Sequence, residues 1–196
     1  LRQNWAFYFV EKYKIMPPFE KILVKYDIDL VYFLSPNKLA IDLVKINYMT
    51  TVWDLSHRDT PEFPEVRAFR KFEGREILYT QALKKSIGII TDSNKGKINI
   101  IKRYGIDKNR VYAVSYLPSQ NAINTNIVDV KKKYCIGDNY IYYPAQFWSH
   151  KNHIYILDAI KLLLKDNINL KAVFSGSNQG NLNYVLEYAK NIGVRN

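Results

Sequence analysis

The chain has 196 residues but only one cysteine, Cys135. A single cysteine excludes a disulfide within the chain and a zinc site built from several cysteines, and it is typical of a reducing compartment. No uninterrupted apolar run approaches the roughly 18 to 20 residues of a membrane-spanning helix. The longest candidate, 154–164, is interrupted by Asp158 and Lys161. The first residues do not match the pattern of a signal peptide, because charges flank their short apolar stretch on both sides.

Acidic side chains are few compared with basic ones. The 18 Asp and Glu stand against 29 Lys and Arg, which gives a formal net charge of +11. This balance favours anionic partners, namely nucleic acid, an anionic membrane surface or phosphorylated substrates. The chain has no zinc finger and no aromatic–basic RNA-binding signature, and its 16 tyrosines are scattered along the sequence. We therefore expect no nucleic-acid partner, and a nucleic-acid-binding protein is the least favoured alternative.

Short apolar strands alternate with helical patterns along the chain. Strands are predicted at 30–34, 48–53, 87–91, 110–116, 140–143 and 170–174. Helices are predicted at 5–14, 18–26, 64–85, 92–104, 128–134, 151–165 and 181–191. This alternation predicts an α/β fold with parallel sheets, arranged as two Rossmann-like doubly wound units. Residues 119–126 are polar and unpatterned, which favours a linker there.

Polar residues follow the predicted strands, where ligands of such folds bind beyond the carboxyl ends of the sheet. They are Asp54 and His57, Asp92 and Ser93, 146–151, and 175–180. The clearest signal is the stretch YIYYPAQFWSHKN at 140–152, where a strand feeds a loop and then a predicted helix with Lys151 in its first turn. Unpaired first-turn N–H groups, the helix macrodipole and a lysine together favour a phosphorylated ligand.

Each candidate also has a structural interpretation. Ser93 fits a helix N-cap, and Asp54 fits a turn residue that bonds its own backbone. A capping or core-edge hydrogen bond suits His57, and Lys151 fits a solvated surface side chain. Two histidines, at 150 and 153, have the spacing of a helix face but lack a third ligand, so we expect no metal site.

Four segments, in this order, resemble the retaining glycosyltransferases of family 4, which have the GT-B fold. They are TVWDLSHRDTPEFPEV (51–66), IITDSNKGKINIIKRYGI (89–106), YYPAQFWSHKNHIYILDAIKLL (142–163) and FSGSNQGN (174–181). The first is similar to a Trp-Asp-Leu-x-His-Arg signature of a bacterial subgroup. The segments span most of the chain, and the resemblance implies a GT-B-like α/β fold whose two domains face a cleft.

The resemblance also implies a division of labour between the domains. Residues 1–120 would form the acceptor-side domain, with its start missing, and 121–196 the beginning of the nucleotide-sugar-binding domain. The paired glutamates of the family, which hold the ribose and the sugar, would lie beyond Asn196. We therefore expect the chain to be part of a longer protein and to be inactive by itself.

The expected donor site lies in the second domain. Lys151 matches the phosphate-contacting lysine of the family, which stabilises negative charge on the leaving diphosphate without proton transfer. Gln146 stands where many members have an arginine. The resemblance implies that Asn152, Gly176 and Ser177 hold the nucleotide-sugar together with these two residues.

The expected acceptor side lies in the first domain. Many members have a histidine at the end of the strand that here ends in Trp53. Asp54 and His57 follow closely, so they join Lys151 as the catalytic candidates.

The sequence thus predicts a glycosyltransferase that moves a sugar from a nucleotide-sugar to a polysaccharide or lipid-linked acceptor. We expect no cofactor apart from the donor substrate and no metal. The expected location is cytoplasmic, and the basic charge suits peripheral binding to anionic lipid at the inner membrane face. The alternative is a non-catalytic GT-B module or pseudo-enzyme, because Gln146 supplies no positive charge.

Overall fold

The computed structural model describes residues 12–13, 15–123, 129–137 and 139–194. The chain divides into two compact units. Unit 1 comprises Leu1–Pro61 and Val66–Leu117, and unit 2 comprises Glu62–Glu65 and Pro118–Asn196. The assignment of 1–120 to the acceptor and 121–196 to the nucleotide-sugar stays a prediction, and the predicted helix at 5–14 lies almost entirely outside the described residues.

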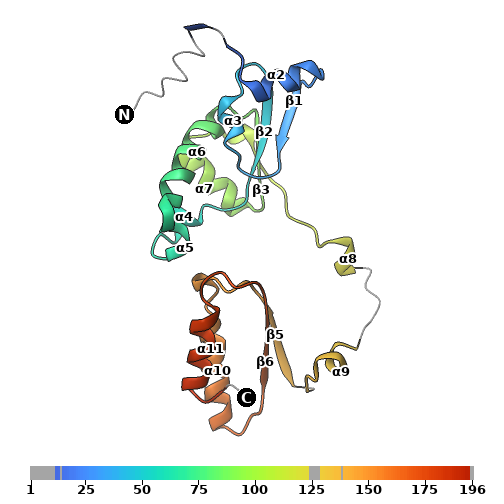
Figure 1. Ribbon diagram of the computed structural model, residues 1–196, viewed down its shortest axis with the longest axis vertical. Coiled ribbons are helices and arrows are strands. Elements are labelled where there is room, and N and C mark those ends of the chain that lie inside the picture. The colour runs from blue at the N-terminus through green and yellow to red at the C-terminus, as the bar shows by residue number, and fades with distance from the viewer. Residues whose placement is uncertain (1–11, 14, 124–128, 138, 195–196) are drawn as a thin grey trace. The chain divides into compact units, whose positions relative to one another are not determined.

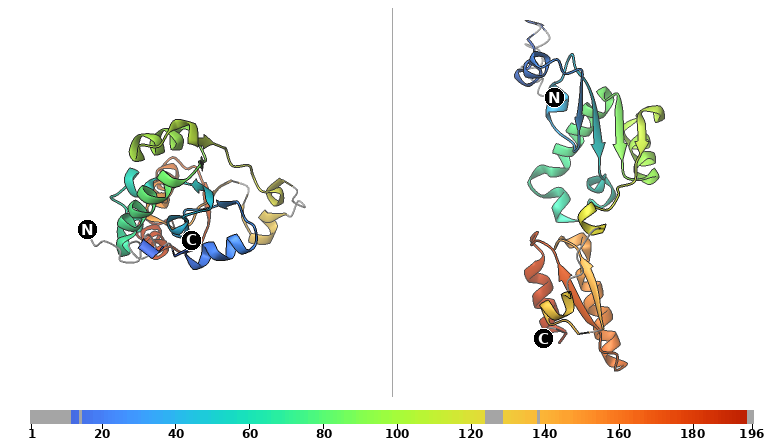
Figure 2. Two further views of the ribbon diagram at one scale, coloured as in Figure 1. Left: turned by 90° about the horizontal axis from the view of Figure 1, so that it is seen from above. Right: turned by 90° about the vertical axis from the view of Figure 1, so that its right-hand side faces the viewer.

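Unit 1 is built on a parallel sheet of four strands in the order β1-β2-β3-β4, which Figure 2 shows side by side. The strands are β1 (Leu30–Phe33), β2 (Asn47–Val52), β3 (Gly88–Thr91) and β4 (Val111–Ala113). The register pairs Phe33 with Thr50, and Thr51 with Ile90. Since all the strands run in the same direction, their carboxyl ends meet at one edge of the sheet.

A helix precedes the first strand and helical segments connect the strands that follow, as Figure 1 shows. In chain order they are α2 (Pro18–Lys25), α3 (Leu39–Asp42), α4 (Ser56–Asp59), α6 (Lys71–Lys85), α7 (Asn94–Tyr104) and the 3₁₀ turn η2 (Lys108–Arg110). The core lies between one face of the sheet and α6 and α7, where Tyr48, Leu83, Ile89 and Ile100 are fully buried. On the opposite face about half of each side chain stays exposed for Leu30, Tyr32, Tyr112 and Val114.

Two expectations for unit 1 need correction. The segment 64–85 is not one helix but α5 (Pro64–Arg67), a 3₁₀ turn η1 (Ala68–Arg70) and α6. Phe69 and Arg70 have φ of 55° and 60°, a left-handed conformation that neither residue favours and that the sequence pattern does not signal. The stretch between the predicted strand at 48–53 and the predicted helix at 64–85, where no helix is predicted, contains the single helical turn α4.

Unit 2 contains a parallel strand pair, β5 (Tyr140–Pro144) and β6 (Lys171–Ser175). The other elements are α8 (Gln120–Ile123), α9 (Val130–Tyr134), the 3₁₀ turn η3 (Ser149–Lys151), α10 (His153–Lys165) and α11 (Leu182–Asn191). Phe147, Leu157, Val185 and Ala189 form the core of this unit. The order strand, helix, strand, helix confirms a parallel α/β arrangement. None of the helices in the described residues combines the length and apolar character needed to cross a membrane.

Candidate functional site

A hollow lies at the carboxyl edge of the unit 1 sheet, where β2 and β3 end and α7 begins. Its cavity volume is about 170 Å³, which is smaller than the roughly 300 to 1,000 Å³ of most sites for drug-sized ligands. Trp53 and Asp54 line it after β2, Asp92 and Ser93 after β3, and Lys95 from the first turn of α7. Polar residues that follow two neighbouring strands in the sequence therefore surround one hollow.

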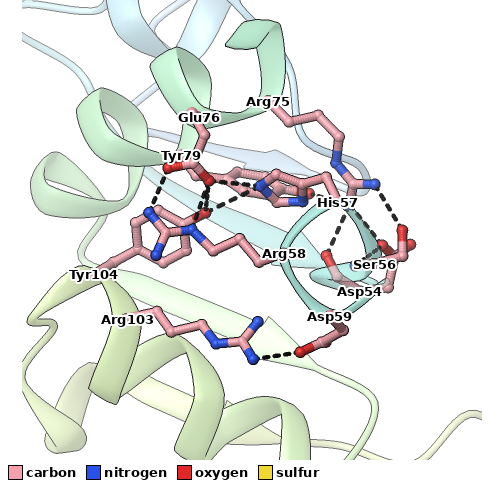
Figure 3. A network of polar contacts seen from close by, with 10 residues as sticks. All are labelled: Asp54, Ser56, His57, Arg58, Asp59, Arg75, Glu76, Tyr79, Arg103 and Tyr104. Atoms are coloured by element: carbon pink, nitrogen blue, oxygen red, sulfur yellow. Dashed lines mark hydrogen bonds and ion pairs between the residues drawn. The ribbon is translucent and has the colours of Figure 1, made fainter. Parts of the chain in front are cut away.

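Asp54 is held by the loop that it begins. Its Oδ1 accepts hydrogen bonds from the Ser56 backbone N–H at 2.8 Å and from Arg75 at 2.7 Å. Arg75 also donates to the Asp54 carbonyl oxygen at 2.9 Å, and Figure 3 shows its guanidinium directed at this turn. Burial raises the pKa of Asp54, but the hydrogen bonds from Ser56 and Arg75 outweigh it and hold the pKa below its usual value. Asp54 is thus a carboxylate of fixed orientation at neutral pH.

His57 is fully buried, and its Nε2 lies 2.7 Å from Glu76 Oε1. Glu76 also accepts hydrogen bonds from the Arg58 guanidinium and from the Tyr104 hydroxyl at 2.8 Å, as Figure 3 shows. The bonds from Arg58 are the largest cause that lowers the pKa of Glu76, to about 2. Burial lowers the pKa of His57, and the nearby Arg75 cation lowers it further. The hydrogen bond and negative charge of Glu76 act in the opposite direction but do not outweigh these two effects.

The His57 imidazole is therefore neutral near pH 7 and sits inside a network that joins α4, α6 and α7. Because the side chain has no exposed surface, a direct contact between His57 and a substrate would require the α4 turn to open. The predicted catalytic role of His57 stays a prediction. The geometry gives it a structural task, which is to anchor the loop that forms one wall of the hollow.

Other charges around the hollow differ in how they are paired. Asp59 forms an ion pair with Arg103. Asp92 Oδ1 instead accepts a hydrogen bond from the Ser93 hydroxyl at 3.0 Å, and Ser93 Oγ accepts the Gly96 N–H at 3.1 Å. Ser93 is thus the N-cap of α7, as its structural interpretation predicts.

Lys151 lies in η3, two residues before α10 begins, and not in the first turn of that helix. Asn152 separates the two elements because its backbone is left-handed, with φ of 47°. The Lys151 carbonyl oxygen accepts a hydrogen bond from the Tyr143 hydroxyl at 2.9 Å, which ties this backbone to the end of β5. The Lys151 side chain is exposed.

Gln146, Gly176 and Ser177 come together beyond the carboxyl ends of β5 and β6. The Ser177 carbonyl oxygen accepts, at 3.0 Å, the backbone N–H that follows Gln146. A Cβ at Gly176 would lie 2.3 Å from the Ala145 carbonyl oxygen, so only glycine allows the two loops to pass this closely. The Gln146 side-chain oxygen accepts from the Trp148 indole at 2.9 Å. The expected donor residues therefore share one edge of unit 2, with Gln146 already engaged.

The two histidines of this loop have separate surroundings. His153 is buried and stacks on Phe147, with 4.5 Å between the ring centroids. His150 Nδ1 lies 2.6 Å from Glu65 Oε1 within the same unit. Among the residues that the structure describes, no three His, Cys, Asp or Glu side chains are grouped to hold a metal ion.

Sequence reasoning missed the residues that fix the unit 1 loop, namely Arg58, Arg75, Glu76 and Tyr104. All four belong to helices, and the three in α6 and α7 look in the sequence like ordinary helix-surface residues. Their partners are 18 to 28 positions away in the chain, and no local pattern encodes such pairings. The only local signal was the cluster of charges around His57.

Neither a scan against protein-family models nor a search of curated proteins gives a match. Among solved structures, the chain is similar to a crystal structure of a glycosyltransferase from Rickettsia africae ESF-5, with a TM-score of 0.61 and 17% sequence identity. The similarity covers 91% of this chain and 47% of that one, so the chain spans about half the length of the solved protein. At this level of identity the likeness establishes the fold alone, an α/β architecture with parallel sheets that is consistent with a Rossmann-like unit.

Proposed function

We propose that the protein is a glycosyltransferase that moves a sugar from a nucleotide-sugar donor to a polysaccharide or lipid-linked acceptor. The observation that carries this proposal is the fold shared with a glycosyltransferase over 91% of the chain. It gains support from the polar residues that gather beyond the carboxyl ends of the strands in each unit, which is where α/β proteins bind ligands.

On the donor side, Lys151 stabilises the departing diphosphate. Glycosyl transfer from a nucleotide-sugar builds up negative charge on the leaving group, and a preorganised cation lowers the free energy of that state. The Lys151 side chain is exposed, while its backbone is fixed to β5 by Tyr143. The adjacent start of α10, a helix of 13 residues without a side-chain cap, adds partial positive charge. Asn152, Gly176 and Ser177 complete the donor site.

On the acceptor side, the hollow of unit 1 receives the hydroxyl that attacks the donor sugar. Asp54 supplies a carboxylate in a fixed orientation there, since Arg75 and Ser56 hold one of its oxygens. His57 acts through Glu76 as a positioning residue for the same loop. The net charge of +11 favours work at an anionic membrane surface inside the cell.

A second candidate is a GT-B module without catalysis. It is favoured by Gln146, which carries no charge and whose side-chain oxygen is engaged by the Trp148 indole. Release of nucleoside diphosphate from a panel of nucleotide-sugars, measured with the full-length gene product and membrane extract as acceptor, separates the two functions. Turnover of one donor supports the transferase. Binding of a donor without turnover, under all acceptor conditions, supports the module.

A further inference from the structure

The hollow of unit 1 has an aromatic wall whose orientation is fixed. Trp53 directly follows β2, and 55% of its surface is exposed although the residue lines the hollow. Its indole N–H donates to the Leu34 carbonyl oxygen at 3.1 Å, which anchors one edge of the ring beside the end of β1. An exposed aromatic ring held in this way is a preformed apolar platform, because it loses little conformational entropy when a ligand stacks on it.

Polar side chains of the hollow come from the start of α7 and the residues just before it. Asp92 is half-buried and oriented by the Ser93 hydroxyl, which engages only its Oδ1. Asn99 and Lys95 also line the hollow and supply amide and ammonium donors. Asp54 and Asp59, the other two carboxylates that line the hollow, form ion pairs with Arg75 and Arg103. Asp92 is therefore the lining carboxylate that can accept hydrogen bonds from a ligand.

The walls that carry these groups are rigid. Asp54 is locked to Arg75 on one side, and Asp59 to Arg103 on the other. At the start of α7, a Cβ on Gly96 would lie 2.4 Å from Thr91 Oγ1, so the first helical turn packs directly on the end of β3. The hollow therefore keeps its shape in the absence of a ligand, as small-molecule sites usually do.

We infer that this hollow binds one pyranose ring of a carbohydrate, stacked on Trp53 and hydrogen-bonded through its hydroxyl groups to Asp92 and Asn99. A sugar presents an apolar C–H face and an edge of hydroxyl groups, and this pairing of an aromatic ring with a carboxylate and an amide matches both. A phosphate group would meet Asp92 and Asp54, which disfavours an anionic ligand here. The identification of this sugar as the acceptor of the transfer reaction rests on the proposed function, whereas the binding itself does not.

The experiment measures binding of simple sugars to the 196-residue chain by saturation-transfer NMR and titration. The probes are the methyl glycosides of glucose, galactose, mannose and N-acetylglucosamine. Trp53→Ala and Asp92→Asn should each weaken the best-bound probe by about tenfold or more, the equivalent of one lost charged or stacking contact. Trp53→Phe should restore most of the affinity. Asp29→Asn, at the opposite edge of the sheet before β1, is the matched control and should bind as the wild type does.

Two results would overturn the inference. One is the absence of saturable binding of any probe, and the other is equal affinity in wild type and Trp53→Ala, with both proteins shown to be folded by equal urea midpoints. The outcome for the proposed function is separate. Sugar binding without turnover of any nucleotide-sugar would contradict the proposed transferase function but not the proposed sugar site. If the protein turns over a nucleotide-sugar and Trp53→Ala leaves the acceptor KM unchanged, the result would contradict the proposed sugar site but not the transferase function.

Discussion

Replacement of Glu76 by glutamine tests whether the buried network holds the α4 turn. The Glu76 carboxylate accepts hydrogen bonds from His57, from Tyr104 and from two nitrogens of Arg58. The glutamine amide keeps one acceptor oxygen, but its NH₂ group would face the N–H and O–H donors of the network. The ion pair with Arg58 and some of these hydrogen bonds are therefore lost. Exposed ion pairs contribute up to about 1 kcal/mol, and breaking buried ones costs roughly 3 to 5 kcal/mol. The Glu76 side chain is 21% exposed, so we expect a loss of about 2 to 3 kcal/mol.

Urea unfolding measures this loss, and tryptophan fluorescence in a Trp148→Phe background reports on unit 1, because Trp148 is the tryptophan of unit 2. With a denaturant slope of roughly 1 to 3 kcal/mol/M, the midpoint should fall by about 1 to 2 M. Glu73→Gln is the control, because it makes the same change on an exposed residue of the same helix and should shift stability by less than about 0.5 kcal/mol. If Glu76→Gln and Glu73→Gln unfold at the same midpoint, the network does not stabilise the loop and the reasoning is refuted.

Three further changes have expected outcomes. Because burial places the pKa of His57 below 6.5, the unfolded chain binds its proton more readily, so stability should be full above about pH 6.5 and fall as the pH drops below it, with a shallower fall in His57→Gln; equal slopes would contradict this. Glu20→Ala leaves the N–H groups of Val44, Lys45 and Ile46 without their shared carboxylate oxygen and should cost about 3 kcal/mol in urea unfolding, against almost nothing for Glu73→Ala. Gly176→Ala drives a methyl group into the Ala145 backbone and should unfold unit 2 at lower urea, whereas Gly137→Ala, whose nearest neighbour atom is 3.9 Å away, should not; an unchanged midpoint for Gly176→Ala would show that the loops can separate freely.

Local signals predicted much of the fold. Ser93 and Gly105 mark the start and end of α7 because a cap hydroxyl and a left-handed glycine act within a few residues of the chain. The break at Phe69 and Arg70 carries no such mark, since neither residue is of a type that favours a positive φ. Similarly, Asn152 delays the start of α10 by two residues, although the polar sequence around Lys151 suggested an earlier helix.

The sequence predicted that polar residues follow β2 and β3, but it did not predict how these residues bond to one another. Polar residues after β2 and β3 do gather around one hollow, because parallel strands bring their carboxyl ends together. The ties of Asp54 to Arg75 and of His57 to Glu76 depend on how α6 packs on the loop after β2. Such contacts are set by tertiary packing, so a local reading of residues 54–59 left a structural and a functional interpretation equally open.

The most direct test of the account is the rate of nucleoside diphosphate release from the preferred nucleotide-sugar by the full-length protein with Lys151→Ala. Removal of one preorganised group that stabilises the leaving charge should lower turnover by about 10²- to 10³-fold. Lys161→Ala, which removes an exposed lysine from the same unit on α10, should turn over the donor at the wild-type rate. Equal donor affinity and equal turnover in Lys151→Ala and wild type would contradict the proposed role of Lys151 in the transfer reaction.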